Sequence, residues 1–169
     1  MEDGAGVGEL LGTVDDIDYY LGSSYLFKEV DSTRLYRVYN DLVGGVDKGL
    51  CVSRTFPKKV RAQNGVEKGT FLWMTSNTVG HDHCVSPTNI SMLHMAMSDF
   101  LRKVGRGIIT IEGVEYLISN NGFDPILRLL HTLNDRVAVS SHLVLVTLDE
   151  ATLEPREMRI LEKDFELAL

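Results

Sequence analysis

The chain has 169 residues, of which 44% are hydrophobic and 24% are charged, and its formal net charge is −7. This composition predicts one soluble globular domain and excludes a disordered chain. The acidic balance argues against a nucleic-acid partner, because binding the phosphate backbone needs clustered lysine and arginine. No apolar run approaches the roughly 18 residues of a membrane span, and the two cysteines show no paired spacing, so we expect a cytoplasmic protein without a membrane partner.

Apolar residues recur at helical spacing in the N-terminal segment. Leu10, Val14, Ile17 and Leu21 lie three or four residues apart, with aspartates between them. This spacing predicts a short amphipathic helix around residues 10–21. We therefore divide the chain into an N-terminal tail with this helix, residues 1–21, and a single α/β domain, residues 22–169.

From residue 25 onward, strand and helix patterns alternate along the chain. Continuous apolar runs predict five strands, at residues 25–30, 49–53, 70–75, 108–112 and 142–148. Amphipathic patterns predict helices at residues 33–43, 56–61, 87–104, 125–133 and 154–167. Strands that are apolar on both faces and alternate with helices indicate a three-layer α/β fold, with a mostly parallel sheet covered by helices on both faces.

Six segments, taken in their order along the chain, carry a family resemblance. They are residues 22–27, 49–54, 71–74, 86–89, 112–117 and 121–123. Together they resemble the archaeal family called domain of unknown function 835, whose members are often fused to sensory and receiver modules of signalling proteins. The layout is also similar, more distantly, to the RecA-like ATPases related to the circadian clock protein KaiC. These resemblances imply a regulatory setting and the strand order 3-2-4-5-1, counted over the five strands along the chain.

The turn after the first strand lacks the residues of a phosphate loop. The chain contains no G-x-x-x-x-G-K-[ST] motif, and Glu29 and Asp31 stand where glycines and a lysine would hold a triphosphate. Two carboxylates at this point repel phosphate, and Arg34 offsets only one of them. Glu112 stands where the RecA resemblance implies a magnesium-binding aspartate. We therefore expect no nucleotide cofactor and no ATP hydrolysis.

Ligands of an open parallel sheet bind outside the carboxyl ends of its strands. The candidate ligand-binding residues at those ends are Asp31, Ser32, Thr33, Ser53, Arg54, Glu112 and Asp149, and Glu115 and Thr147 lie beside them. A structural role explains some of the same residues equally well. In that interpretation Asp31 and Ser32 cap the following helix, and Arg54 pairs with Glu112 across neighbouring strands.

Four adjacent potential metal ligands form the run His81-Asp82-His83-Cys84. Imidazole and thiolate suit zinc, but adjacent ligands rarely complete a tetrahedral site, and the other histidines show no matching spacing. We therefore interpret the run as a polar surface loop and predict no metal. Cys51 lies in an apolar strand, where a thiol is usually inert packing.

The function that these patterns favour is a non-catalytic regulatory or protein-interaction domain that associates with itself or with a signalling partner. The segment around residues 10–21 and the C-terminal helix, with Leu161, Phe165 and Leu167, are the expected contact surfaces. The alternative is a divergent nucleotide-binding protein or NTPase that uses Arg54, Glu112 and Asp149.

Overall fold

The structure of the protein is a computed structural model that describes residues 8–77 and 83–169. Its centre is a seven-stranded sheet in the order β6-β5-β4-β7-β8-β3-β9, and each neighbouring pair is parallel. The strands are β3 (Ser23–Phe27), β4 (Lys48–Ser53), β5 (Thr70–Met74), β6 (Cys84–Val85), β7 (Gly107–Glu112), β8 (His142–Thr147) and β9 (Leu167–Ala168). The five strands expected from the sequence are the neighbours β5-β4-β7-β8-β3, and the short β6 and β9 extend the sheet at its two edges.

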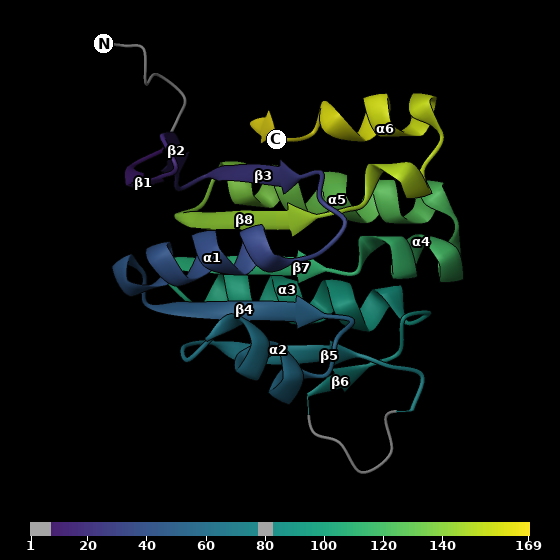
Figure 1. Cartoon of the computed structure of the whole chain (residues 1–169), viewed down its shortest axis with the longest axis horizontal. Coiled ribbons are helices and arrows are strands. Elements are labelled where there is room, and N and C mark those ends of the chain that lie inside the picture. Colours follow the sequence, from purple (N-terminus) through teal and green to yellow (C-terminus); the bar gives the residue numbers. More distant parts are fainter. Residues whose placement is uncertain (1–7, 78–82) are drawn as a thin grey trace.

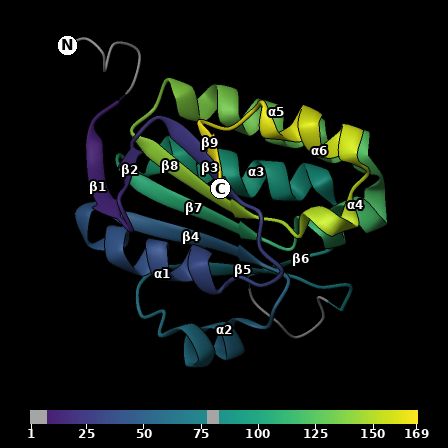
Figure 2. The ribbon, with the colours of Figure 1, turned by 45° about the horizontal axis from the view of Figure 1, so that its top comes forward.

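Six α-helices lie on the two faces of this sheet within the described residues. They are α1 (Thr33–Leu42), α2 (Pro57–Asn64), α3 (Ile90–Lys103), α4 (Val114–Asn121), α5 (Phe123–Ala138) and α6 (Pro155–Glu162). Short 3-10 turns follow α1, at Val43–Gly45, and β8, at Glu150–Thr152. Figures 1 and 2 show α1 and α2 on one face and α3, α5 and α6 on the other. The predicted α/β class, with helices on both faces of a mostly parallel sheet, is confirmed.

The alternation of side chains along each strand explains the three layers. In β8, Leu143 and Leu145 pack in the cluster under α1, whereas Val144 and Val146 pack in the cluster under α3 to α6. All four are essentially inaccessible to solvent. Because successive side chains of a strand point to opposite faces, a run that is apolar throughout must be covered on both sides.

The N-terminal segment is a β-hairpin, so the prediction of a helix at residues 10–21 is wrong. Strands β1 (Leu10–Val14) and β2 (Ile17–Tyr20) are antiparallel. Asp15 and Asp16 form the two-residue turn between them, with φ of 51° and 65°, as a hairpin turn of the primed type requires. The side chains of Val14 and Tyr19 are buried against α1. Residues on either side of a two-residue turn reproduce helical spacing by chance, which misled the prediction.

The C-terminal segment also differs from its prediction. Helix α6 ends at Glu162, and the following residues turn back to form β9 beside β3. Backbone N–H groups of Glu166 and Leu169 donate to the carbonyl oxygens of Ser24 (2.8 Å) and Leu26 (2.8 Å). Leu161 and Phe165, expected on a contact surface, lie in the core instead.

Candidate functional site

A cavity of about 460 Å³ opens at the carboxyl ends of the central strands. It is lined by the loop after β3 (Glu29, Val30, Asp31, Ser32), by Arg54 and Thr55 after β4, by Lys59 and Gln63 of α2, by Glu112, Gly113, Glu115 and Tyr116 around the start of α4, and by Thr147 of β8. We call it the strand-end pocket. Its volume is in the range of small-molecule sites, and its position is the one that ligands of open parallel sheets occupy.

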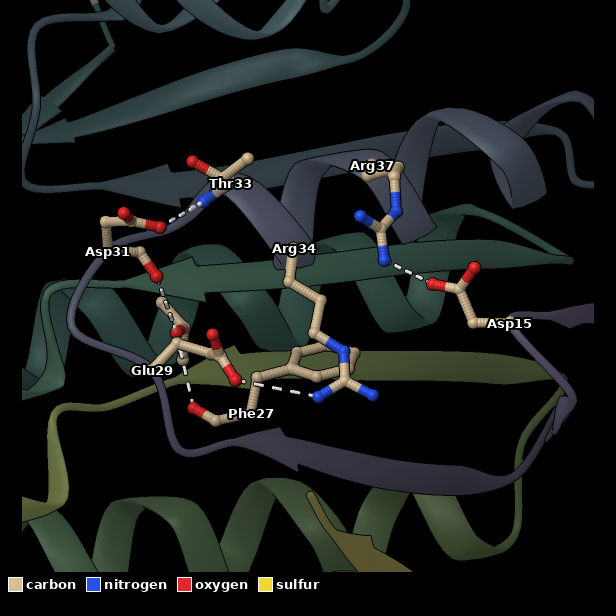
Figure 3. A network of polar contacts seen from close by, with 8 residues as sticks. Asp15, Phe27, Glu29, Asp31, Thr33, Arg34 and Arg37 are labelled. Carbon is tan, nitrogen blue, oxygen red and sulfur yellow. Dashed lines mark hydrogen bonds and ion pairs between the residues drawn. The ribbon is translucent and has the colours of Figure 1, made fainter.

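The loop after β3 is held by contacts within the chain (Figure 3). The carboxylate of Asp31 accepts a hydrogen bond of 3.1 Å from the backbone N–H of Thr33, the first residue of α1. The Thr147 hydroxyl lies 3.3 Å from the carbonyl oxygen of Phe27 and 3.4 Å from that of Asp31. The loop is therefore fixed to both α1 and β8.

Arg34 of α1 is held on the sheet side of this loop. Its guanidinium is 3.6 Å from the carboxylate of Glu29 and 5.3 Å from the centre of the Phe27 ring. Figure 3 shows the side chain extended toward both partners. Arg34 does not line the strand-end pocket, so this cation neutralises Glu29 and does not serve as a phosphate ligand there.

The carboxylate of Glu112 is bound by the end of β4. It accepts hydrogen bonds from the Ser53 hydroxyl (2.7 Å), the Thr55 hydroxyl (3.3 Å) and the Thr55 backbone N–H (3.4 Å). Ser53 and Glu112 are register partners in adjacent parallel strands, which places their side chains on the same face of the sheet. The contact therefore follows from the strand register.

Arg54 does not form the ion pair with Glu112 that the structural interpretation predicts. Because Arg54 follows Ser53 by one residue, its side chain leaves the face that Ser53 and Glu112 share. Its guanidinium lies over the ring of Tyr116, 4.1 Å from the ring centre. Tyr116 is partly buried, and a cation placed in this way over a tyrosine ring contributes about 0.5–2 kcal/mol.

A buried hydroxyl lies close enough to Glu112 to be affected by its charge. Tyr36 of α1 is inaccessible to solvent, and its hydroxyl has no hydrogen-bond partner among the described residues. Burial raises the pKa of Tyr36, and the nearby charge of Glu112 raises this pKa further. Tyr36 therefore stays neutral.

Four of the seven residues predicted from the strand ends line the pocket: Asp31, Ser32, Arg54 and Glu112. Ser53 is buried beneath it and supports Glu112. Thr33 and Asp149 lie outside the lining. The carboxylate of Asp149 instead accepts a hydrogen bond of 3.0 Å from Ala151 at the start of the turn after β8.

The sequence reasoning missed several lining residues: Val30, Thr55, Lys59, Gln63, Gly113 and Tyr116. Lys59 and Gln63 lie one turn apart on α2, which folds over the strand ends. Their spacing of four residues along one helical face was the available signal. The positions of the strand ends alone did not indicate that helix α2 would form one wall of the strand-end pocket.

The run His81-Asp82-His83-Cys84, interpreted from the sequence as a polar surface loop without a metal, is described only in part. His81 and Asp82 lie outside the described residues, and His83 and Cys84 are described. Elsewhere in residues 8–77 and 83–169, no group of three histidine, cysteine or carboxylate side chains is placed to hold a metal ion. Cys51 is buried, and burial raises the pKa of its thiol, which disfavours the reactive thiolate.

The fold and the strand-end pocket define an α/β domain with a parallel sheet and a cavity at its carboxyl edge. The chain belongs to the family described as "Protein of unknown function (DUF835)", whose model matches residues 29–165. This match confirms the resemblance to the domain of unknown function 835 that the sequence indicated. None of the curated proteins compared with the chain matches it.

A similar solved structure comes from Pyrococcus horikoshii OT3, where it is described as a "Structural study of Project ID PH0250". Its TM-score is 0.58 at 11% sequence identity, over 86% of this chain and 79% of that chain. At this identity the likeness shows the fold alone. Among the residues that the structure describes, no helix has both the length and the apolar character needed to cross a membrane.

Proposed function

We propose that this protein is a non-catalytic regulatory or protein-interaction domain, built on a RecA-like and KaiC-like scaffold that has lost its phosphate loop. The observation that carries the proposal is the contact between the Asp31 carboxylate and the backbone N–H of Thr33. A phosphate loop uses the N–H groups at the start of this helix to hold phosphate. Here the chain's own carboxylate takes that place.

The charges around the loop support the same conclusion. Glu29 and Asp31 flank the turn, and the nearest arginine of α1, Arg34, is paired with Glu29. A triphosphate at the start of α1 would lie beside the carboxylate of Asp31, and the cation nearest to it on α1 is already paired. Repulsion between like charges, in a loop without glycine, opposes binding and hydrolysis.

The support for a regulatory role comes from the family resemblance. Domains of this family are often joined to archaeal signalling modules, which suggests a similar setting for this chain. In this proposal the domain acts by binding a protein partner or a second copy of itself. The two surfaces expected from the sequence are largely packed in the core. Met92 and Met95, which are 51% and 61% exposed on α3, offer a different contact surface, since methionine adapts readily to a partner.

A thermal-shift series with ATP, ADP and GTP, each with magnesium, tests the loss of phosphate binding. A ligand present at 100 times its dissociation constant adds about 2.7 kcal/mol to the free energy of unfolding, which such a series detects. We expect no stabilisation and no release of phosphate from ATP. Stabilisation that is lost in Arg54→Ala and Glu112→Ala would overturn the proposal in favour of the divergent nucleotide-binding alternative.

Light scattering tests self-association. We expect a mass above that of the monomer, and we expect Met92→Ser/Met95→Ser to restore the monomer. Arg102→Gln, an exposed change near the end of the same helix, is the control and should leave the mass unchanged. If the protein is a monomer at every concentration, self-association is rejected and a different protein must be the partner. Pull-down from native extract then searches for that partner, with the Met92→Ser/Met95→Ser variant as the comparison.

A further inference from the structure

The strand-end pocket contains charges of both signs that do not neutralise one another. Arg54 and Lys59 are its cations, and within the described residues neither forms an ion pair or a side-chain hydrogen bond. Glu112 and Glu115 have no cationic partner in the same part of the chain, and accept only from hydroxyl and backbone N–H groups. Opposite charges that share one cavity without pairing leave space for a ligand that contacts both.

The two signs lie at different places in the pocket. The cations come from the end of β4 and from α2. The carboxylates come from the end of β7 (Glu112), from the first turn of α4 (Glu115) and from the loop after β3. Along the sheet these strands follow the order β4-β7-β8-β3, and neighbouring strands are about 4.8 Å apart. The cations therefore lie on the β4 side of the pocket, and the carboxylates extend from β7, next to β4, to β3.

The balance of charge favours a ligand with a net positive charge. Four carboxylates line the pocket, Glu29, Asp31, Glu112 and Glu115, but Glu29 is neutralised by Arg34 from outside the lining. Three carboxylates then face two cations. A ligand that complements this set carries one negative group and two positive groups.

We propose that the strand-end pocket binds a basic amino acid or a small molecule of that class, with one carboxylate and two cationic nitrogen groups. The ligand carboxylate contacts Arg54 and Lys59, and its cationic groups contact the carboxylates around Glu112, Glu115 and Asp31. The exposed side chain of Val30 covers the ligand's aliphatic part at the rim. The inference goes beyond the proposed regulatory role, because it assigns a ligand to the domain.

The pair of L-lysine and cadaverine gives the sharpest test, because cadaverine is lysine without its carboxylate. We expect L-lysine or L-arginine at millimolar concentration to raise the melting temperature saturably. Cadaverine should bind about tenfold more weakly or not at all, since it leaves Arg54 and Lys59 unpaired. L-glutamate, with the opposite balance of charge, should give no shift.

Two substitutions locate the binding. Arg54→Gln and Glu115→Gln should each weaken the binding of L-lysine by about tenfold or more, whereas Arg102→Gln on the outer part of α3 should leave it unchanged. Lys59→Ala gives an independent measurement on an exposed residue, should Arg54→Gln impair folding. Circular dichroism checks the fold of each variant.

Three outcomes would overturn the inference: no shift with either basic amino acid, equal binding of cadaverine and L-lysine, or binding that the pocket variants leave unchanged. These outcomes can be told apart from failure of the proposed regulatory function, because that function is tested with ATP and GTP and not with amino acids. If a nucleotide binds and L-lysine has no effect, both the proposed loss of phosphate binding and the amino-acid ligand are rejected.

Discussion

The carboxylate of Asp31 accepts its hydrogen bond from the N–H of Thr33, so one of the free N–H groups at the start of α1 is bound from within the chain. A negative charge at this end also interacts favourably with the helix dipole. Asp31→Ala should therefore lower the free energy of unfolding by about 0.5–1.5 kcal/mol, measured by urea denaturation.

Asp31→Asn is the matched control for this change. Its side-chain oxygen can still accept from Thr33, so most of the stability should be retained. Neither variant should gain affinity for ATP, because the loop still lacks glycine and lysine. If Asp31→Ala unfolds at the same urea concentration as the unchanged protein, the contact contributes nothing and the N-terminus of α1 does not depend on it.

The turn of the N-terminal hairpin gives a prediction whose sign depends on the fold of this segment. Asp16 has φ of 65° at the second position of the turn, where glycine is the favoured residue. Asp16→Gly should stabilise the protein by up to about 1 kcal/mol, since glycine adopts this conformation without steric cost. In a helix the same change would destabilise, by about 0.3 kcal/mol, because glycine is a poorer helix former than aspartate.

Asp18→Gly serves as the comparison for the turn variant. Asp18 lies in β2 and accepts a hydrogen bond of 2.6 Å from the Thr13 hydroxyl. Glycine weakens a strand interior and removes this contact, so the stability should fall. Destabilisation by both changes, measured in the same denaturant series, would contradict the hairpin.

Gly49 is required by the close approach of a tyrosine. A Cβ atom at this position would overlap the Tyr39 hydroxyl and lie 2.8 Å from the ring carbon Cζ. Tyr39 cannot move away freely, because its hydroxyl donates to the carbonyl oxygen of Lys68 at 2.8 Å. Gly49→Ala should lower the free energy of unfolding by about 1–3 kcal/mol, as overpacking does.

Gly44→Ala is the control for this prediction. The nearest atom to its added Cβ, Lys68 Nζ, is 3.9 Å away, so the change should be nearly neutral. Tyr39→Leu in the Gly49→Ala background should recover part of the loss by removing the clash. A Gly49→Ala protein that melts with the unchanged chain would show that the tyrosine is not confined as the structure places it.

The central sheet was predictable because its signal is local. A run such as residues 142–148 is apolar at every position but His142 and Thr147, and this pattern fits a strand buried on both faces. The two short edge strands carry no such signal. Leu167 and Ala168 form a strand only because the backbone of β3 beside them offers hydrogen-bond partners, which is a tertiary effect.

The site was predictable to the extent that strand ends determine it. Asp31, Arg54 and Glu112 line the pocket because carboxyl ends of parallel strands meet at one edge. The pairing of Arg54 was wrong because it depends on which face of the sheet a side chain occupies. A shift of one residue in a strand end moves the side chain to the other face, and the sequence leaves that register open.

A buried histidine at the start of β8 predicts how stability depends on pH. His142 is 2% exposed, neither ring nitrogen has a hydrogen-bond partner among the described residues, and its ring packs edge-on against Phe100. Burial lowers the pKa of His142 below its ordinary value of 6.5, and the neighbouring backbone of Val104 and the charge of Asp47 oppose this shift only in part. Below about pH 6.5 the unfolded chain therefore binds a proton at this residue more readily than the folded chain does.

The sign follows from that difference in bound protons. The stability that neutral His142 contributes is present above pH 6.5 and is lost as the pH falls below 6.5 toward the lower pKa of the folded state. Asp164 changes the stability in the opposite direction with pH, because burial raises its pKa. Both the unchanged protein and His142→Leu keep Asp164, so its contribution cancels in their comparison. His142→Leu removes the titrating group and should flatten the dependence. Urea denaturation at about pH 7.5 and about pH 5, on either side of the ordinary histidine pKa, measures it. An equal loss of stability in His142→Leu and in the unchanged protein would show that protonation occurs elsewhere.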